Sequence, residues 1–559
     1  GWEPKQFLIL LSILMACWLV LSIYIRRLYL SNLVVSIQKR KLGELSISEL
    51  DNASLDIIKA GLTSSFPAEI FYCLNLLETI EHPEINELLK QVLSNSNRDV
   101  RMDVLKRIAS MKIQPLTRHI SERIEIETDR AVRGQALITY AALAPDDIIE
   151  KLSVHLEGLD PDLTHGALVG ILTYDPNNSK ANDFLLRAVR SGSIHDKLFA
   201  AKVMADIGSK HFSGFLVELL EDQDNAVMEQ AIYAAGQMGD ERLIKSLVSK
   251  LTNPALLPAA SAALRLYGEE ALYDLDQGFS SPEASREERL HIIDIIREVG
   301  GVRATEILLR HIDVEQPEIR HRVFLSLAGL HYQADPDDQY IFVNKLDEEV
   351  TGITWLLAAM EDIYDIEQYH LVHSALGHEL DVKQDNMLLL ISFLFPSIVM
   401  LDTRANIDSK VAELRIFALE VLDNLLTGEI KQVVLPLLDD LTVAERLAAL
   451  AEKFPQESMS AEDRFNDIVE SHFDNAFFWT RSTLLYQIGQ DRESRLIRKV
   501  RESLQDGEAT IRETGLWALA RLKPPDLRRT LQIHAGDPHE NVSDIVRYLL
   551  ADLPAPEPT

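Results

Sequence analysis

The sequence predicts an all-α protein, in which one N-terminal transmembrane helix precedes an α-α superhelix of helix pairs with a period of about 31–33 residues. Three observations support this fold class. An uncharged run of residues opens the chain, similar segments recur at regular spacing after it, and few windows alternate apolar and polar residues as a half-buried strand would. More than 500 residues follow the apolar run, which is too many for one compact core but ordinary for an elongated array.

The N-terminal run, residues 7–25, carries no charge and is followed at once by Arg26 and Arg27. As a helix it would reach about 28 Å, close to the thickness of the hydrocarbon layer of a bilayer. A secretory signal peptide would have a basic segment first and small residues at a cleavage site, and neither is present. We therefore predict a pre-membrane segment over 1–6 and a transmembrane helix over 7–27, with a signal peptide and a buried core helix as alternatives.

Charge predicts the orientation of this helix. The stretch after it is basic and contains no acidic residue up to residue 41, so the positive-inside rule places the following domain in the cytoplasm. Residues 28–52 are expected to form a basic stem or linker helix. The residues predicted to lie at the membrane interface are Trp2, Tyr24, Arg26, Arg27, Tyr29, Lys39, Arg40 and Lys41. The chain begins with Gly1 and not with Met, so either a start was trimmed or the chain is the tail of a longer protein, in which case the run would be its last span.

The formal net charge of the chain is −31, and its acidic residues lie almost entirely beyond the N-terminal segment. Such a body repels phosphate backbones, so nucleic acid is not expected as a partner. Of two cysteines, Cys17 lies in the predicted span, which leaves Cys73 alone in the rest of the chain. One cysteine makes neither an internal disulfide nor a cysteine-rich zinc site, and this fits a reducing compartment.

The repeat array is predicted over residues 53–335. Similar second-helix segments start 29–33 residues apart, at Pro67, Val100, Val132, Leu163, Asp196, Val227, Leu256, Glu288 and Ile319. The turn before each second helix carries Asp or Asn, such as Asn97, Asp160 or Asp224, which can cap the helix start. The fifth position of the segment is mostly small, so neighbouring helices should pack closely there. Left-handed glycines are expected at the helix ends Gly208, Gly239, Gly268 and Gly300.

Arginine at the second position of the segment suggests a ladder along the array. These residues, expected to bind turn acids of a neighbouring unit, are Arg101, Arg133 and Arg320. Helix pairs of about 31 residues with a D-x-x-V-R turn resemble HEAT repeats in their short bacterial form, a HEAT-like solenoid. Tetratricopeptide units are the nearest rival, but their tryptophan-leucine-glycine pattern is absent.

The pattern loosens over 336–405, which we predict to be an irregular helical insert. Its very apolar run, residues 387–401, is short for a span and contains a proline, so a buried helix pair is expected, with a re-entrant or membrane-surface contact as the alternative. A second HEAT-like segment is expected over 406–549, followed by a disordered tail over 550–559.

A block in the second segment, ALEVLDNLLTGEIKQVVLPLLDD from Ala418 to Asp440, is similar to the C-terminal helical extension of some bacterial transporter-like proteins. Those proteins join a multi-span domain resembling ATP/ADP translocases or major-facilitator carriers to HEAT-like repeats. The resemblance implies a bacterial inner membrane, with the repeat domain facing the cytoplasm. Only one helix of such a transport domain is present here, so no nucleotide-binding residue is carried over.

Chemistry-bearing residues form no catalytic constellation in the sequence. The densest metal-capable cluster is His370, His373 and His378, which are candidate ligands or simply solvated and core-edge histidines. No Gly-Lys-Ser or Gly-Lys-Thr phosphate loop and no Gly-x-Ser-x-Gly elbow occurs. We therefore predict no enzyme activity and no cofactor.

The largest aromatic cluster contains Phe477, Phe478 and Trp479, which are candidates for partner contact, with packing against the array as the alternative. The function predicted is a membrane-tethered cytoplasmic scaffold that binds or regulates protein partners and is attached to a transporter-like domain. The first alternative is the C-terminal part of a nucleotide or solute antiporter, and the second is a lyase-type enzyme.

Overall fold

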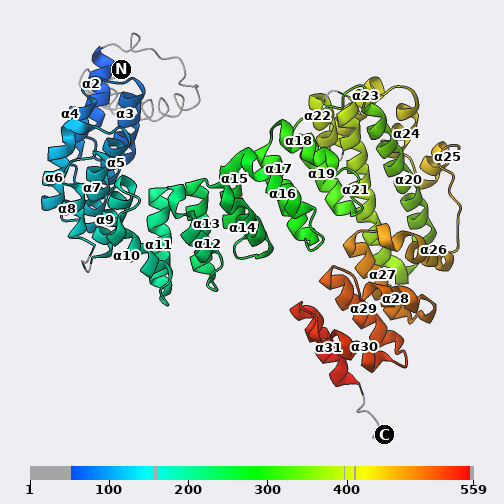
Figure 1. The fold of residues 1–559 in the computed structure, drawn as a ribbon. Helices are drawn as coiled ribbons and strands as arrows, with labels where there is room; N and C mark the ends of the chain where they lie inside the picture. The colour runs from blue at the N-terminus through cyan, green and yellow to red at the C-terminus, as the bar shows by residue number, and fades with distance from the viewer. Residues whose placement is uncertain are drawn as a thin grey trace, which may run out of the picture. The chain divides into compact units, whose positions relative to one another are not determined.

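The computed structural model describes residues 52–553 apart from 157, 159, 396, 408 and 410, and within them every regular element is a helix (Figure 1). The chain divides into two compact units, residues 1–190 and 191–559. The all-α prediction and the helix-pair architecture are therefore confirmed for the described residues.

The first unit is a stack of helix pairs. Its second helices α3, α5, α7 and α9 pack on one another in sequence order, with the remaining helices along one side. The helices are α2 (Asn52–Gly61), α3 (Pro67–Thr79), α4 (Ile85–Val92), α5 (Arg98–Ser110), α6 (Thr117–Ile126), α7 (Arg130–Ala142), α8 (Ile148–Ser153), α9 (Pro161–Tyr174) and α10 (Ser179–Val189).

Helices α7 and α9 approach each other most closely, and two glycines make this contact possible. A Cβ atom on Gly166 would lie 2.3 Å from the carbonyl oxygen of Gly134 and 2.8 Å from its Cα. A Cβ atom on Gly134 would in turn lie 2.5 Å from the carbonyl oxygen of Asp162. Any larger residue at either position would therefore push backbone against backbone.

The second unit begins with the same arrangement. Helices α11, α13, α15, α17 and α19 stack in order, and their partners lie beside them. The bounds are α11 (Ile194–Ile207), α12 (Ser213–Leu220), α13 (Asn225–Met238), α14 (Ile244–Ser249), α15 (Leu257–Tyr267), α16 (Leu272–Phe279), α17 (Arg286–Val299), α18 (Gly301–Arg310) and α19 (Pro317–Gly329).

Two helices of double length follow, α20 (Gln339–Ile363) and α21 (His370–Leu394), which pack along each other. Helix α21 lies against α19 on one side and against α27 on the other, so it continues the stack. The stack then ends with its last pairs. These are α27 (Phe478–Asp491), α28 (Ile497–Ser503), α29 (Ala509–Leu522), α30 (Leu527–Ile533) and α31 (Glu540–Asp552).

The helices between α21 and α27 leave the stack as a side branch. They are α22 (Ser397–Ile407), α23 (Ala412–Leu425), α24 (Gly428–Leu438), α25 (Val443–Leu450) and α26 (Ala461–Asp467). Helix α22 packs on α21, while α25 and α26 return to α20 (Figure 1). The departure from the repeat pattern thus begins later than the predicted insert 336–405, because α20 and α21 are long but still occupy a place in the stack.

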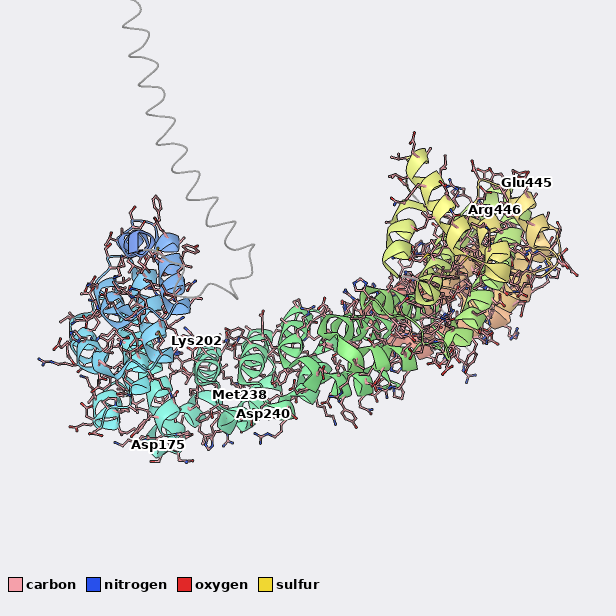
Figure 2. The ribbon with its side chains drawn as sticks, turned by 90° about the horizontal axis from the view of Figure 1, so that it is seen from above. Asp175, Lys202, Met238, Asp240, Glu445 and Arg446 are labelled. Carbon is pink, nitrogen blue, oxygen red and sulfur yellow. The ribbon has the colours of Figure 1, made fainter. Side chains whose placement is uncertain are left out.

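The capping residues explain where the second helices begin. Asn97 Oδ1 accepts hydrogen bonds from the backbone N–H of Asp99 at 2.8 Å and of Val100 at 3.3 Å, and Asp160 and Asp224 act in the same way. Gly208 and Gly239 end their helices in the left-handed conformation, as predicted. Just beyond Gly239, Asp240 caps the next helical turn (Figure 2).

The predicted arginine ladder is found in part. Arg101 reaches Glu127 in the turn of the next unit, with Nε to Oε2 at 3.0 Å and Nη2 to Oε1 at 3.1 Å. Arg320 lies 3.7 Å from Glu349, a residue within helix α20, and not from a turn acid. The Nε of Arg133 is buried with no hydrogen-bond partner among the described residues.

The predicted pre-membrane segment, transmembrane helix 7–27 and most of the stem lie outside the described residues, as do all eight predicted interface residues. No helix of the part that the structure describes is long and apolar enough to cross a bilayer. In the apolar run 387–401, Met387 to Ile391 and Phe393 are buried in the protein, which agrees with the expected buried pair. Helix α31 extends to Asp552, within the predicted tail.

Candidate functional site

Large apolar side chains are exposed around the start of helix α23, and nothing among the described residues covers them. Val411 is 50 % exposed, Leu414 42 %, Ile416 64 % and Phe417 59 %. Four large apolar side chains thus stand in solvent within seven residues, whereas single exposed apolar residues are the rule elsewhere on proteins. Contiguous apolar patches are rarely left in solvent on a soluble domain, so this open apolar surface indicates a site of interaction.

An apolar stripe runs along α23. Leu414, Phe417, Val421 and Leu425 are three or four residues apart, so they share one side of the helix, with the first two exposed and the last two half-buried. A groove of about 340 Å³ lies along this stripe, lined by Phe417, Glu420, Val421, Asn424 and Leu425. We refer to the stripe and its groove as the α23 face.

The opposite side of α23 holds it in the branch. Ala418 and Leu422 are fully buried, and α22 and α24 pack on either side of the helix. Arg415 donates from Nη2 to the carbonyl oxygen of Leu438 at the end of α24, at 3.4 Å. The α23 face is therefore presented by a helix that is packed on its inner side, not by a detached segment.

The charges along the α23 face are negative. Glu413 and Glu420 are exposed on α23, and neither takes part in an ion pair among the described residues. The basic side chains described nearby are already bonded: Arg404 pairs with Asp385, and Lys431 pairs with Asp423 at 2.9 Å. A binding partner would therefore meet uncompensated carboxylates beside the apolar stripe.

A buried polar network joins α19, α20 and α21 near the point where the branch leaves the stack. Glu349 of α20 accepts from Lys383 Nζ at 3.0 Å and from Asn386 Nδ2 at 3.3 Å. Asn386 Oδ1 in turn lies 2.7 Å from Nδ1 of His321 on α19, whose pKa burial holds below its usual value. Since buried charges are tolerated only when they are paired, these contacts fix α19, α20 and α21 in one register.

The return of the chain from the branch is fixed by a second buried pair. Arg464 of α26 is 2 % exposed and donates from Nε to Oδ2 of Asp362 on α20 at 2.9 Å. The same carboxylate accepts from the backbone N–H of Met459 at 3.0 Å. Between these anchors, helix α25 begins with a capping box formed by Thr442 and Glu445. Figure 2 labels Glu445 and its neighbour Arg446. Both ends of the branch are thus anchored to α20 and α21.

The predicted aromatic contact residues lie at the junction of α21 and α27, and only one of them reaches solvent freely. Phe477 is buried, and its backbone N–H donates to the buried Oε1 of Glu379 at 2.9 Å. Phe478 is half-buried under the guanidinium of Arg286, 4.1 Å from its ring centre. Trp479 is 55 % exposed. Packing within the protein thus occupies the Phe477 side chain and most of the Phe478 side chain. Of the three predicted contact residues, Trp479 alone remains on the surface.

The same junction brings together residues that lie far apart in the sequence. The backbone N–H of Phe478 donates to Oε1 of Glu318 at 2.7 Å, and Arg286 lies 3.4 Å from Glu508. Burial raises the pKa of the Glu508 carboxyl, which Arg286 partly offsets. These contacts join α17 and α19 directly to the last pairs of the stack.

The predicted histidine cluster does not come together. The His373 ring packs against Tyr364 at 5.7 Å, and the His378 ring packs against Phe477 at 6.0 Å, while His370 is exposed at the start of α21. Among the described residues, no group of three His, Cys, Asp or Glu side chains is arranged to hold a metal ion.

A second cavity, of about 470 Å³, lies in the first unit beside α10. Its lining consists of Ser153 at the end of α8, Leu156 and Gly158 after it, and Lys180, Asp183, Phe184 and Arg187 of α10. Its charged side chains are exposed and of mixed sign, so it lacks both the apolar area and the single charge sign of the α23 face.

Sequence reasoning missed the α23 face because periodicity marks apolar residues without saying whether a neighbouring helix covers them. The available signal was the run from Val411 to Phe417, where apolar residues fall on more than one side of the helix.

One family model supports the helical-repeat architecture. A family model described as HEAT repeats matches residues 181–268. Among curated protein sequences no match was found. Human deoxyhypusine hydroxylase in complex with glycerol is similar at 12 % identity, covering 50 % of this chain and 96 % of that one, with a TM-score of 0.24.

A karyopherin and an importin are similar over a longer stretch. Kap121p bound to RanGTP shares 13 % identity over 89 % of this chain, with a TM-score of 0.33, and the chain covers 56 % of it. Importin beta shares 13 % identity over 89 % of this chain and 67 % of that one, with a TM-score of 0.23. At these values nothing about ligands or partners carries over. Over its described residues the chain is all-α, and residues 181–268 match the HEAT-repeat model.

Proposed function

We propose that this protein is a non-enzymatic scaffold that binds a protein partner through the α23 face. The observation that carries the proposal is the apolar stripe Leu414, Phe417, Val421 and Leu425 on a helix whose other side is packed. Four apolar side chains on one helix face, with a groove between them, match the surfaces on which proteins place their central binding contacts.

The remainder of the proposal rests on the sequence. The uncharged run 7–25 and the basic residues after it support a membrane tether, with the repeat domain on the cytoplasmic side. The similarity of the block Ala418–Asp440 to extensions of transporter-like proteins supports attachment to such a domain. The α23 face would then stand at the membrane's cytoplasmic side, able to receive a soluble or membrane-bound protein.

Photo-crosslinking in intact cells tests the docking role. A photoreactive phenylalanine analogue replaces Phe417 in one variant and Tyr273, which is 66 % exposed on α16, in the control. We expect a discrete adduct with another protein from position 417 that is lost when Val421→Asp is added, and no such adduct from position 273. Absence of an adduct at 417, or equal adducts at both positions, would overturn the docking role.

A thiol-labelling experiment tests the tether. Gln505 is exposed, so Gln505→Cys provides a reporter on the repeat domain. Cys73 contributes little background, because burial raises the pKa of its thiol to about 11. A membrane-impermeant reagent should label the thiol introduced at position 505 only after the cells are opened, and the chain should sediment with membranes. Labelling in intact cells would contradict the proposed orientation.

A further inference from the structure

We infer that the occupant of the α23 face is an amphipathic helix from another protein, with an apolar stripe flanked by Lys or Arg. This inference rests on the proposed docking role of α23 and specifies the chemistry of the partner. It follows from the shape of the α23 face, from its charges, and from the poor fit of two other occupants, a second copy of the chain and an anionic lipid surface.

The shape of the α23 face suits a helix. The stripe from Leu414 to Leu425 runs along most of a 14-residue helix, which is about 21 Å long. A helix of three to four turns laid along it would present side chains at every third or fourth residue, matching the spacing of the stripe. The groove of about 340 Å³ between Phe417 and Leu425 would receive one or two of the partner's large apolar side chains.

The negative charges of the α23 face favour a positively charged partner. Glu420 lines the groove itself, and Glu413 stands one turn from Phe417, near the start of the helix. Neither carboxylate has an ion-pair partner among the described residues, whereas Arg404 pairs with Asp385 of α21, and Arg415 and Lys431 are engaged within the branch. Lys or Arg beside the partner's apolar stripe would therefore meet two free carboxylates, which favours encounter and orientation.

A second copy of the chain fits the face poorly. Two α23 helices packed face to face would bring the Glu420 side chains of the two copies toward each other across the groove. Each copy also carries a formal net charge of −31, so association of like chains works against long-range repulsion. An anionic lipid surface is disfavoured on the same ground, because Glu413 and Glu420 would face its headgroups.

Peptide binding to the purified full chain tests the inference. The probe is an 18-residue helical peptide with Leu and Phe at helical spacing and Lys on both flanks. The matched peptide has Glu in place of every Lys. We expect the Lys peptide to bind about tenfold or more tightly than the Glu peptide, with an affinity that falls as salt rises, measured by fluorescence anisotropy.

Variants of the chain assign the binding to the α23 face. The double variant Glu413→Gln, Glu420→Gln should weaken the Lys peptide by about threefold to tenfold and reduce its salt dependence, while leaving the Glu peptide little changed. Phe417→Ser should weaken both peptides by more than tenfold. The control Tyr273→Ser changes an exposed aromatic residue on α16 and should change neither affinity.

Four results would overturn the inference. They are equal binding of the two peptides, binding of neither, a dimer of the full chain that Phe417→Ser dissociates, and binding to vesicles of anionic phospholipid that Phe417→Ser abolishes. These outcomes are separable from failure of the docking role. If peptides fail to bind but the cellular adduct at position 417 persists, the scaffold function stands and only the helical, basic nature of the partner is rejected.

Discussion

Arg512 binds both carboxylate oxygens of Asp537, 25 residues further along the chain, with Nε to Oδ2 at 2.9 Å and Nη2 to Oδ1 at 2.8 Å. Its remaining nitrogen donates to the carbonyl oxygens of Asp506 and Gly507 in the turn before its own helix. Arg101 makes the same set of contacts, with Glu127 as its partner. One guanidinium thus ties the turn of its own repeat to the turn of the next, which fixes the spacing of the stack.

The first prediction concerns this link. Arg512→Met should lower the free energy of unfolding of the second unit by about 2–4 kcal/mol, because it leaves the largely buried Asp537 carboxylate without its partner. Urea unfolding followed through the fluorescence of Trp517 on α29 would measure the change. The control is Arg547→Met, since Arg547 pairs with Asp544 on the open surface of α31 and should contribute no more than about 1 kcal/mol. Equal losses in the two variants would contradict the bridging role.

The same pair predicts a pH dependence. The hydrogen bonds of Arg512 hold the pKa of Asp537 below its usual value. A carboxyl with a lowered pKa in the folded state stabilises the fold above its unfolded pKa of about 3.9, and this contribution is lost as the pH falls through the folded value. The stability difference between the unsubstituted chain and Arg512→Met should therefore be constant near neutrality and shrink below about pH 4. A difference that persists unchanged at pH 3 would exclude this origin.

A third prediction concerns the close contact of α7 and α9. Gly166→Ala should destabilise the first unit by about 1–3 kcal/mol or more, since its Cβ would meet the backbone of Gly134 at 2.3 Å. Amide hydrogen exchange of peptides from α7 and α9 should become faster as a result. Gly214→Ala on α12, where no atom lies within 4 Å of the added Cβ, is the matched control and should be neutral or slightly stabilising. Comparable behaviour of the two variants would contradict the packing explanation.

Features that depend on local chemistry were the ones the sequence could predict. The caps Asn97, Asp160 and Asp224 all bond the first turn of their helices, because a short polar side chain there has unpaired N–H groups within reach. The small fifth positions, such as Ala136 and Ala231, are fully buried. Gln316, which precedes α19 in the same way, makes no such bond.

Features that depend on which helix packs next to a given one could not be predicted in this way. The repeat pattern fades in α20 and α21 because each is about twice the usual helix length, yet α21 still packs between α19 and α27. Arg320 therefore meets Glu349 of α20 where Arg101 meets a turn acid. The α23 face was missed for a related reason, since the same apolar residues would be core if one more helix pair followed.

A fourth prediction concerns the end of α29. Lys523 stands in the left-handed region, with φ 52° and ψ 52°, where L-residues with a side chain are strained. Lys523→Gly should raise the free energy of unfolding by about 1 kcal/mol, as measured by urea unfolding. The reverse change, Gly239→Ala at the left-handed end of α13, should lower it by a similar amount. A loss of stability in Lys523→Gly would show that the lysine side chain matters more than the backbone conformation.

The final prediction concerns the polar network at the root of the branch. His321 lies among Asn386 at 2.7 Å, Asp385 at 3.8 Å, and the guanidinium groups of Arg404 and Arg322. Burial is the main cause that lowers its pKa, the two arginines lower it further, and Asn386 and Asp385 act in the opposite direction. In the unfolded chain the imidazole returns to a pKa of about 6.5.

The sign of the effect follows from proton uptake. Below about pH 6.5 the unfolded chain binds a proton at His321 that the folded chain takes up only at lower pH, so the second unit loses stability as the pH falls through this window. The slope from this residue is at most about 1.4 kcal/mol per pH unit. His321→Gln should reduce the slope of the unfolding free energy between about pH 7 and 5.5, with His195→Gln, which removes an exposed imidazole, as the control for losing a histidine. If His321→Gln leaves the slope unchanged, the network does not respond to pH through this residue, and its role is confined to fixing the register of α19 against α21.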